Sequence, residues 1–164
     1  MTGMPSRNRE GAHLRAAGAA MQIDDRTEWL ETDGLGGFAS GTTAGIRTRR
    51  YHALLLTATT PPTGRVVLVN GFDAWVDTKA GSFALSAQRY APDVLHPDGT
   101  SHITGFTNDP WPTWEFEGAD RTRVSQEIFV QHGTGATFIV WTLVTGKGPM
   151  LNSVGAAGET GGPS

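Results

Sequence analysis

The sequence predicts an all-β protein built as an antiparallel β-sandwich. Apolar and polar residues alternate with the two-residue period of strands, and no stretch of about 10 to 15 residues has the periodicity of a helix. Turn-forming residues recur at short intervals, and the chain has 22 glycines and 9 prolines. Short strands separated by frequent tight turns are typical of sandwiches.

Two segments alternate as strands do when one face is buried and the other is wet. In residues 113–117, Trp114 and Phe116 take the apolar face and glutamates take the other. Residues 124–131 repeat the pattern, with Val124, Ile128 and Val130 on the apolar parity.

Three further segments are apolar on both parities and rich in β-branched residues: Ala53 to Thr57, Val66 to Val69 and Thr137 to Val144. This composition is expected of central strands covered on both faces, so we expect these segments to form the core. Between Asp77 and Phe106 the pattern is weakest, and its apolar residues fit short strands or loop.

Turn signals separate these segments. They are Pro61–Gly64, Asn70–Gly71, Lys79–Gly81, His96–Gly99, Asn108–Pro110 and Gly133–Gly135.

We expect one sandwich domain, residues 23–149, between two tails. The 164 residues suffice for an ordinary core. Residues 1–22 carry arginines and a small-residue run too short and too weakly apolar for a signal peptide, so we expect a flexible tail. After Pro149 the sequence becomes rich in glycine and alanine and loses periodicity, which predicts a disordered tail over residues 150–164.

Composition excludes several classes of partner. The net charge of -3 provides no broad positive field for nucleic acid or anionic membrane. No window approaches about 18 consecutive apolar residues, so we predict no membrane span. Cysteine is absent, which rules out disulfides and fits a cytoplasmic protein. Neutral partners are therefore favoured.

The sequence offers little catalytic or metal-binding chemistry. Gly34–Ala39 has the spacing of a dinucleotide fingerprint but lacks the preceding strand and the following helix. The five histidines lack the spacing of a metal site, and Ser40 lacks the strand-to-helix setting of a serine nucleophile. We predict no cofactor and no metal.

Carboxylate pairs are the remaining catalytic candidates, because glycoside hydrolysis uses two acids at a controlled separation. Such pairs are common, and the one beside Trp114 is better interpreted as a solvated strand face. The pairs are Glu28 with Glu31, Asp73 with Asp77, and Glu115 with Glu117.

A cluster of arginines precedes an aromatic residue and a histidine. In extended conformation, Arg49 and Tyr51 would point to one side and Arg50 and His52 to the other. Two interpretations stay open: an ion-paired clamp on the neighbouring glycine loop, or contact with sugar hydroxyls. The carboxylates available to the clamp are Glu28, Glu31 and Asp33.

A second candidate lies at residues 108–114, where Pro110 and Pro112 hold the backbone extended beside two tryptophans. Flat indole faces can stack on sugar rings. Strand parity assigns Trp114 to the core, so Trp111 is the surface candidate.

Several motifs resemble the amino-terminal domain of bacterial and archaeal glycogen debranching enzymes. The resemblance covers roughly residues 26 to 149. Its continuous motifs are Glu28–Leu30, Asp33–Thr42, Thr48–His52 and Pro110–Trp114. Its single residues are Pro62, Gly64, Arg65, Val66, Phe129, His132 and Gly133. Three positions depart from the family pattern: Asp33 stands where asparagine is usual, Phe38 where tyrosine is common, and Ala53 where glycine follows the histidine.

The resemblance implies a supersandwich-like domain that precedes a catalytic (α/α)6 barrel with amylo-α-1,6-glucosidase activity. In such enzymes the catalytic acids lie in the barrel, so we expect no catalytic residue here and no activity of this chain alone. The expected partners are an α-glucan such as glycogen and the barrel, which would lie in cis or be missing, leaving the sandwich incomplete at its C-terminus.

Ten residues follow as candidates for recognition or structure. At the substrate or domain interface we expect Asp33, Arg49, Arg50, Tyr51, His52 and Trp111. As structural glycines, permitting positive φ or close backbone approach, we expect Gly34, Gly36, Gly37 and Gly41.

Two other functions stay open. One is a stand-alone carbohydrate-binding sandwich that uses Trp111 and Tyr51. The other is a self-contained glycosidase that uses a pair such as Asp73 and Asp77.

Overall fold

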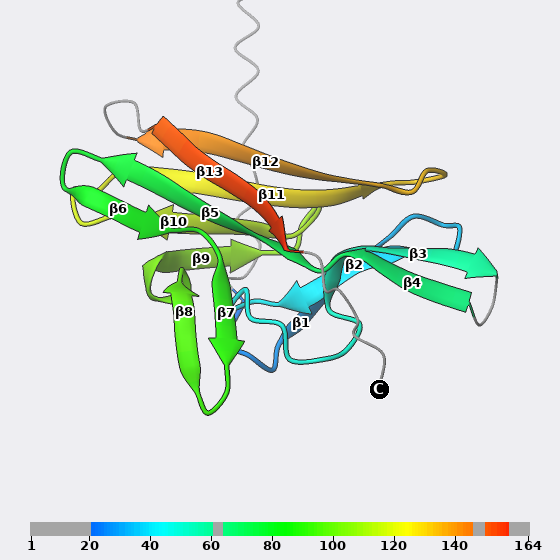
Figure 1. Ribbon diagram of the computed structural model, residues 1–164. Helices are drawn as coiled ribbons and strands as arrows, with labels where there is room; N and C mark the ends of the chain where they lie inside the picture. Colours follow the sequence, from blue (N-terminus) through cyan, green and yellow to red (C-terminus); the bar gives the residue numbers. More distant parts are fainter. Residues whose placement is uncertain (1–20, 61–63, 146–149, 158–164) are drawn as a thin grey trace, which may run out of the picture.

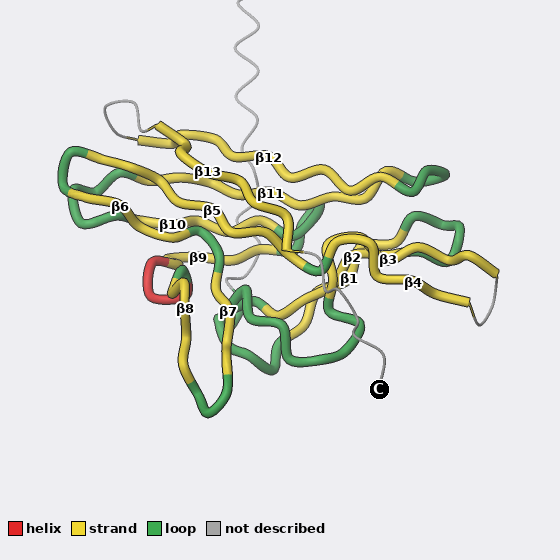
Figure 2. Tube along the Cα trace, in the orientation of Figure 1, coloured by secondary structure: helices red, strands yellow, loops and turns green. Residues whose placement is uncertain are grey.

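The computed structural model describes residues 21–60, 64–145 and 150–157, the last of these by its backbone alone. Within these residues the chain forms thirteen β-strands and a single 3-10 turn, η1 (Thr100–His102). Figures 1 and 2 show that strands make up nearly all of the regular structure. The predicted all-β class is confirmed.

The strands form four antiparallel sheets. The first, ordered β1-β2-β3-β4, contains β1 (Glu28–Thr32), β2 (Phe38–Thr42), β3 (Ala53–Thr60) and β4 (Gly64–Val69). The second, ordered β12-β11-β10-β9, contains β9 (Ile103–Thr107), β10 (Thr113–Glu117), β11 (Arg123–Gln131) and β12 (Ala136–Thr145). The third, ordered β13-β5-β6, contains β5 (Gly71–Thr78), β6 (Gly81–Ala84) and β13 (Met150–Ala157). The fourth is a hairpin of β7 (Ala87–Tyr90) and β8 (Val94–Asp98).

One aromatic core joins the first three sheets. Phe72 of β5 packs edge-on against Trp141 of β12, with 5.4 Å between ring centroids, so the second and third sheets face each other as a sandwich. Trp29 of β1 packs edge-on against Trp114 of β10 at 5.6 Å, which attaches the first sheet to the same core. Figure 1 shows the first sheet extending to one side of this sandwich.

The alternation predicted for β10 and β11 is confirmed. Trp114, Phe116 and Ile128 are each 2% exposed, and the polar residues between them lie on the outer face. Gln126 shares the buried face of β11, where its Oε1 accepts a hydrogen bond of 2.9 Å from the indole N–H of Trp141. This bond satisfies a polar group that the alternation alone does not explain.

The prediction that all three doubly apolar segments are covered central strands is wrong for two of them. Residues 53–57 do lie in an inner strand, β3, and Leu56 is 1% exposed. β4 and β12 instead lie at sheet edges, with Leu68 55% and Phe138 42% exposed. Composition predicts that an apolar face will be covered, but it does not say which element covers it.

The predicted disordered tail is wrong for part of its length. Met150–Ala157 form β13, which pairs antiparallel with β5. The prediction counted only side-chain burial, whereas ladder hydrogen bonds are made by the backbone and are open to small residues. Residues 158–164, and residues 1–20 of the predicted amino-terminal tail, lie outside the described residues.

Asp33 organises the glycine loop between β1 and β2. Its buried carboxylate Oδ1 accepts hydrogen bonds from the N–H groups of Leu35 (2.7 Å) and Gly37 (2.9 Å). Its backbone carbonyl accepts a 2.7 Å bond from the N–H of Gly133, which ties the loop to the β11–β12 turn. Asp33 therefore fixes the loop both through its side-chain carboxylate and through its backbone carbonyl.

The four candidate structural glycines lie in or beside this loop. Gly34 and Gly36 have φ of 75° and 97°. A Cβ on Gly37 would lie 2.4 Å from Asp33 Oδ2, and one on Gly41 would lie 3.2 Å from the Trp29 indole nitrogen.

We predict that Gly36→Val lowers the free energy of unfolding by more than about 1 kcal/mol, because a β-branched residue is strained at positive φ. Its Cβ would also lie only 3.2 Å from the Cβ of Ala58. Urea denaturation measures the change. Gly135→Val is the matched control, since a Cβ there meets nothing within 4 Å. Equal midpoints for the two variants would contradict the role given to Gly36.

We also predict that Asp33→Ala destabilises the fold by about 1 to 3 kcal/mol, because two N–H groups of the loop, that of Gly37 in a buried hydrogen bond, lose their acceptor. Asp33→Asn retains an oxygen at this position and should cost much less. Denaturation midpoints of both variants test this. If Asp33→Asn proved as damaging as Asp33→Ala, the loop would depend on the negative charge instead of on the acceptor geometry.

Candidate functional site

An open hollow of about 420 Å³ lies beside β1 and β2, where the end of the β2–β3 loop folds back over them. Glu28 and Leu30 share one face of β1, and Ser40 of β2 lies opposite Leu30 in the strand register. The complete lining is Glu28, Trp29, Leu30, Ser40, Arg49, Arg50, Tyr51 and His52.

The expectation that residues 49–52 are extended is wrong. The His52 N–H donates to the Arg49 carbonyl at 3.0 Å and closes a turn. Arg49, Arg50 and Tyr51 are consequently all exposed, whereas His52 is 4% exposed. Instead of a strand with side chains on two faces, residues 49–51 form an exposed tip, and His52 anchors it in the protein interior.

His52 anchors this turn in its neutral form. Its Nδ1 accepts a 3.1 Å hydrogen bond from the Thr48 N–H, so Nε2 carries the proton and faces Glu28 Oε1 at 3.4 Å. Burial lowers the pKa of His52; Glu28 opposes this shift, and the positive charge of Arg49 adds to it. The imidazole is therefore uncharged near neutral pH.

Exposed groups at the tip are held by weaker contacts. Arg49 forms an ion pair with Glu28 at 2.5 Å, so of the three carboxylates considered for a clamp it is Glu28 that pairs with this arginine. The glycine loop follows the opposite end of β1 and is not part of this contact. The Arg50 guanidinium lies over the Tyr51 ring, 5.7 Å from its centroid. Ser40 Oγ donates to the Tyr51 carbonyl at 3.1 Å, which fixes the tip to β2.

The structure brings Arg49, Arg50, Tyr51 and His52 together and leaves the other two candidates elsewhere. Asp33 follows the opposite end of β1, about 17 Å of extended chain away from Glu28. Trp111 precedes β10 in the second sheet.

Trp111 belongs to a row of aromatic residues. Its ring lies 5.1 Å from Phe129, which stacks on Phe138 at 5.1 Å with an interplanar angle of 11°. Its indole N–H donates to Glu127 Oε2 at 3.3 Å. Both the ring and its N–H are thus already engaged by neighbours on the second sheet.

The sequence prediction missed Leu30 and Ser40 as members of the hollow. Leu30 is 56% exposed, unlike its buried neighbour Trp29. Strand parity was the available signal, because a leucine that shares a face with Glu28 must point away from the core.

None of the candidate carboxylate pairs converges in this hollow. Glu28 and Glu31 are three residues apart on one strand, so they point to opposite faces; burial raises the pKa of Glu31. Asp73 and Asp77 are four residues apart on β5, about 13 Å, beyond the separation of about 9.5 Å that glycosidases use. Glu115 and Glu117 both pair with Arg123.

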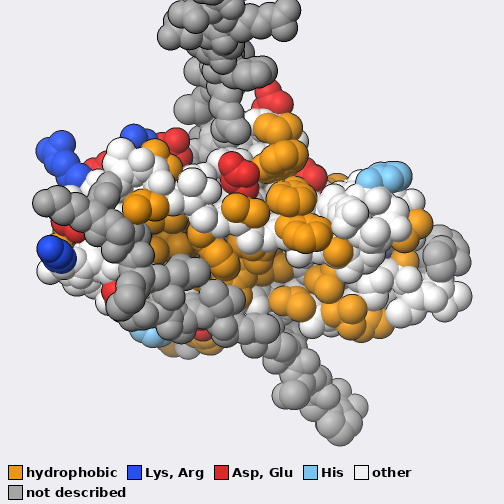
Figure 3. Space-filling view, turned by 90° about the horizontal axis from the view of Figure 1, so that it is seen from above, with side chains coloured by type: hydrophobic (Ala, Val, Ile, Leu, Met, Phe, Trp, Pro, Cys, Tyr) orange, Lys and Arg blue, Asp and Glu red, His pale blue; other side chains and the backbone are white. Residues whose placement is uncertain are grey.

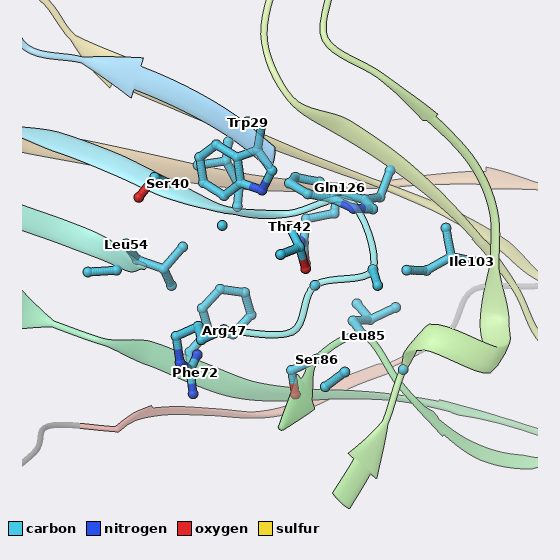
Figure 4. Close-up of a pocket in the computed structure, with 18 of the residues that line it drawn as sticks. Trp29, Ser40, Thr42, Arg47, Leu54, Phe72, Leu85, Ser86, Ile103 and Gln126 are labelled. Atoms are coloured by element: carbon cyan, nitrogen blue, oxygen red, sulfur yellow. The ribbon is translucent and has the colours of Figure 1, made fainter. Parts of the chain in front are cut away.

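A small, partly open cavity of about 60 Å³ lies where the three sheets meet (Figure 4). Trp29, Thr42, Phe72 and Gln126 are among its lining residues, and Figure 4 shows them directed inward from different strands. The volume suits about two water molecules and is far below the roughly 300 Å³ of a small ligand site. This cavity is a gap in the packing.

In the described part of the chain, no group of three histidine, aspartate or glutamate side chains is arranged to hold a metal ion. Across the same residues, no helix has the length and apolarity needed to cross a membrane.

A family model described as glycogen debranching enzyme N terminal matches residues 27–152. The chain belongs to this family. The match spans both sides of the hollow and reaches into β13, and it confirms the family resemblance found in the sequence. Comparisons with curated proteins and with solved structures gave no match.

We predict that this debranching-enzyme N-terminal domain loses stability as the pH falls below 6.5, the ordinary pKa of histidine. The pKa of His52 is lowered by folding, so the unfolded chain binds more protons in this range and acid favours unfolding. Above pH 6.5 the contribution of His52 is fully present.

The free energy of unfolding, measured by urea titration between about pH 7 and pH 5, tests this prediction. His52→Gln should reduce the pH dependence, because the amide is neutral throughout. His96→Gln, at an exposed position, is the matched control. An unchanged pH slope in His52→Gln would remove His52 as the titrating anchor.

Proposed function

We propose that this chain is a non-catalytic N-terminal domain of a glycogen debranching enzyme and that it supports a catalytic (α/α)6 barrel with amylo-α-1,6-glucosidase activity. One observation carries the non-catalytic role. Among the described residues that line the hollow, Glu28 is the sole carboxylate, and Arg49 and His52 already hold it. Hydrolysis of a glycosidic bond by the usual mechanisms needs two such acids.

The exposed outer face of β12 is an argument for a partner domain. β12 is an edge strand of 10 residues without a charged side chain, and Phe138 and Val140 on its outer face are 42% and 40% exposed. Figure 3, which views the molecule from above, shows hydrophobic side chains gathered on the side of the molecule where Figure 1 places β12. Proteins normally protect such edges with charges or cover them, so we assign the catalytic barrel as the cover.

The proposal also concerns substrate and location. The tip formed by residues 49–52 would face the barrel or its α-glucan. The domain would work in the cytoplasm, a reducing compartment in which proteins do not depend on disulfides, and the chain has no cysteine. No cofactor is needed for a supporting role.

A stand-alone carbohydrate-binding module is the second candidate. The observation that favours it is the hollow itself, whose volume of about 420 Å³ fits a small ligand and whose Tyr51 is 45% exposed. Such a module would bind α-glucan without associating with a barrel.

Mixing the chain with a separately produced debranching-enzyme barrel tests the proposal. We expect co-elution of the two in size-exclusion chromatography and no glucose release from a branched α-glucan by the chain alone. Val140→Asp should weaken the association, because it introduces a charge at the apolar face. Ser101→Asp, exposed in η1, is the control. Turnover by the chain alone would show a self-contained glycosidase, and glucan binding without barrel association would favour the second candidate.

A further inference from the structure

A second open hollow, of about 380 Å³, is lined by the same β2–β3 loop as the first. Its lining residues come from the β2–β3 loop and from the tip of the β7–β8 hairpin: Ile46, Arg47, Thr48, Arg89, Tyr90, Ala91, Pro92 and Asp93. The first hollow takes residues 49–52 of the same loop. Residues 46–52 are called here the dividing segment. Residues 46–48 line the second hollow, and residues 49–52, which follow directly in the chain, line the first.

Each hollow contains an exposed tyrosine, and the chain has only these two. Tyr51 is 45% exposed in the first hollow, and Tyr90 is 52% exposed in the second. An aromatic ring with a polar tip suits the apolar C–H face and the hydroxyl rim of a sugar. Both volumes lie in the range of small-molecule sites, about 300 to 1,000 Å³.

The Tyr90 side chain and the Tyr51 backbone are each held by a hydrogen bond before any ligand arrives. The Tyr90 hydroxyl donates to Gln88 Oε1 at 3.1 Å, and the Tyr51 carbonyl accepts from Ser40 Oγ at 3.1 Å. Buried His52 and Ile46, 4% and 3% exposed, anchor the two ends of the dividing segment. Anchoring of this kind reduces the entropy lost on binding.

The charges of the two hollows favour a neutral ligand. Arg49 is paired with Glu28 at 2.5 Å in the first hollow. Arg89 is paired with Asp25 at 3.0 Å and with Asp93 at 3.4 Å in the second. An anion would have to displace these carboxylates from Arg49 and Arg89, whereas sugar hydroxyls can bond to the paired charges without separating them. Arg50, which lies over the Tyr51 ring, adds a positive charge to the first hollow.

We propose that the two hollows form one extended site for a linear α-glucan segment, in which Tyr51 and Tyr90 each contact a sugar ring on either side of the dividing segment. The identity of the sugar rests on the proposed function. Tyr90 takes the role expected of Trp111, whose ring and N–H are engaged by Phe129 and Glu127.

Calorimetric titration of the intact chain with linear α-1,4-linked oligosaccharides of increasing length tests the proposal. Affinity should rise with length until both hollows are filled. Tyr51→Ala and Tyr90→Ala should each weaken binding of the longest oligosaccharide about tenfold and abolish the gain with length. Added salt should change the affinity little, because the ligand is neutral.

Phe138→Ala is the matched control, since Phe138 is an aromatic residue 42% exposed outside both hollows. Urea midpoints of these three variants and of Trp111→Ala, a second control, show whether each remains folded. The proposal is overturned if Tyr90→Ala binds as the wild type does, or if Trp111→Ala or Phe138→Ala reduces the affinity instead.

Failure of this proposal can be told apart from failure of the proposed function. A chain that binds no oligosaccharide but still co-elutes with a catalytic barrel would overturn the extended site and leave the supporting role intact. A chain that binds oligosaccharides through both tyrosines but ignores the barrel would support the site and overturn the supporting role.

Discussion

Burial of the Trp114 indole is the contact on which the rest of the structure depends. The ring packs against Trp29 of the first sheet at 5.6 Å and against Phe106 of its own sheet at 4.9 Å. Its N–H donates to the Thr43 carbonyl at 2.8 Å. Loss of a buried tryptophan typically costs about 3 to 5 kcal/mol, a large part of the stability of a domain. One side chain therefore joins two sheets and fixes the start of the loop that bears the site.

From Thr43 onward, the loop is held by buried groups at its base and by exposed groups at its tip. Ile46 and His52 are buried, and the imidazole satisfies the Thr48 N–H. The Arg49–Glu28 pair has side chains 71% and 35% exposed, and such pairs contribute only about 0 to 1 kcal/mol. The position of the tip is thus set by His52 and the backbone turn more than by the ion pair, which leaves the arginines available for contacts with a partner or ligand.

The sequence predicted those parts of the structure that depend on local pattern. Alternation assigned Trp114 to the core and Trp111 to the surface side, and Glu28 was one of three carboxylates, with Glu31 and Asp33, named as partners for the arginines. It did not predict the turn at residues 49–52, because a single backbone hydrogen bond there overrides the extended geometry that the motif suggests. The pairing of β13 was missed because it depends on β5, more than 70 residues earlier in the chain.

The second hollow was missed for the same kind of reason. It forms where residues 46–48 meet residues 89–93, and neither segment has a pattern that indicates the other. Tyr90 lies in the interval in which the sequence signal was weakest. Its exposure becomes meaningful only when the fold brings it beside the segment that also carries Tyr51.

β4 and β12, which were predicted to be covered on both faces, instead expose apolar side chains. Both strands have apolar side chains on both parities, a composition typical of strands covered on two faces. The described residues cover only one of these faces, so part of the apolar surface that the sequence encodes stays exposed to solvent. Exposed apolar surface of this extent is unfavourable unless another molecule or domain removes it from water. The difference between the burial predicted from composition and the burial observed therefore locates exposed apolar surface on the side of β12, apart from the two hollows at residues 46–52.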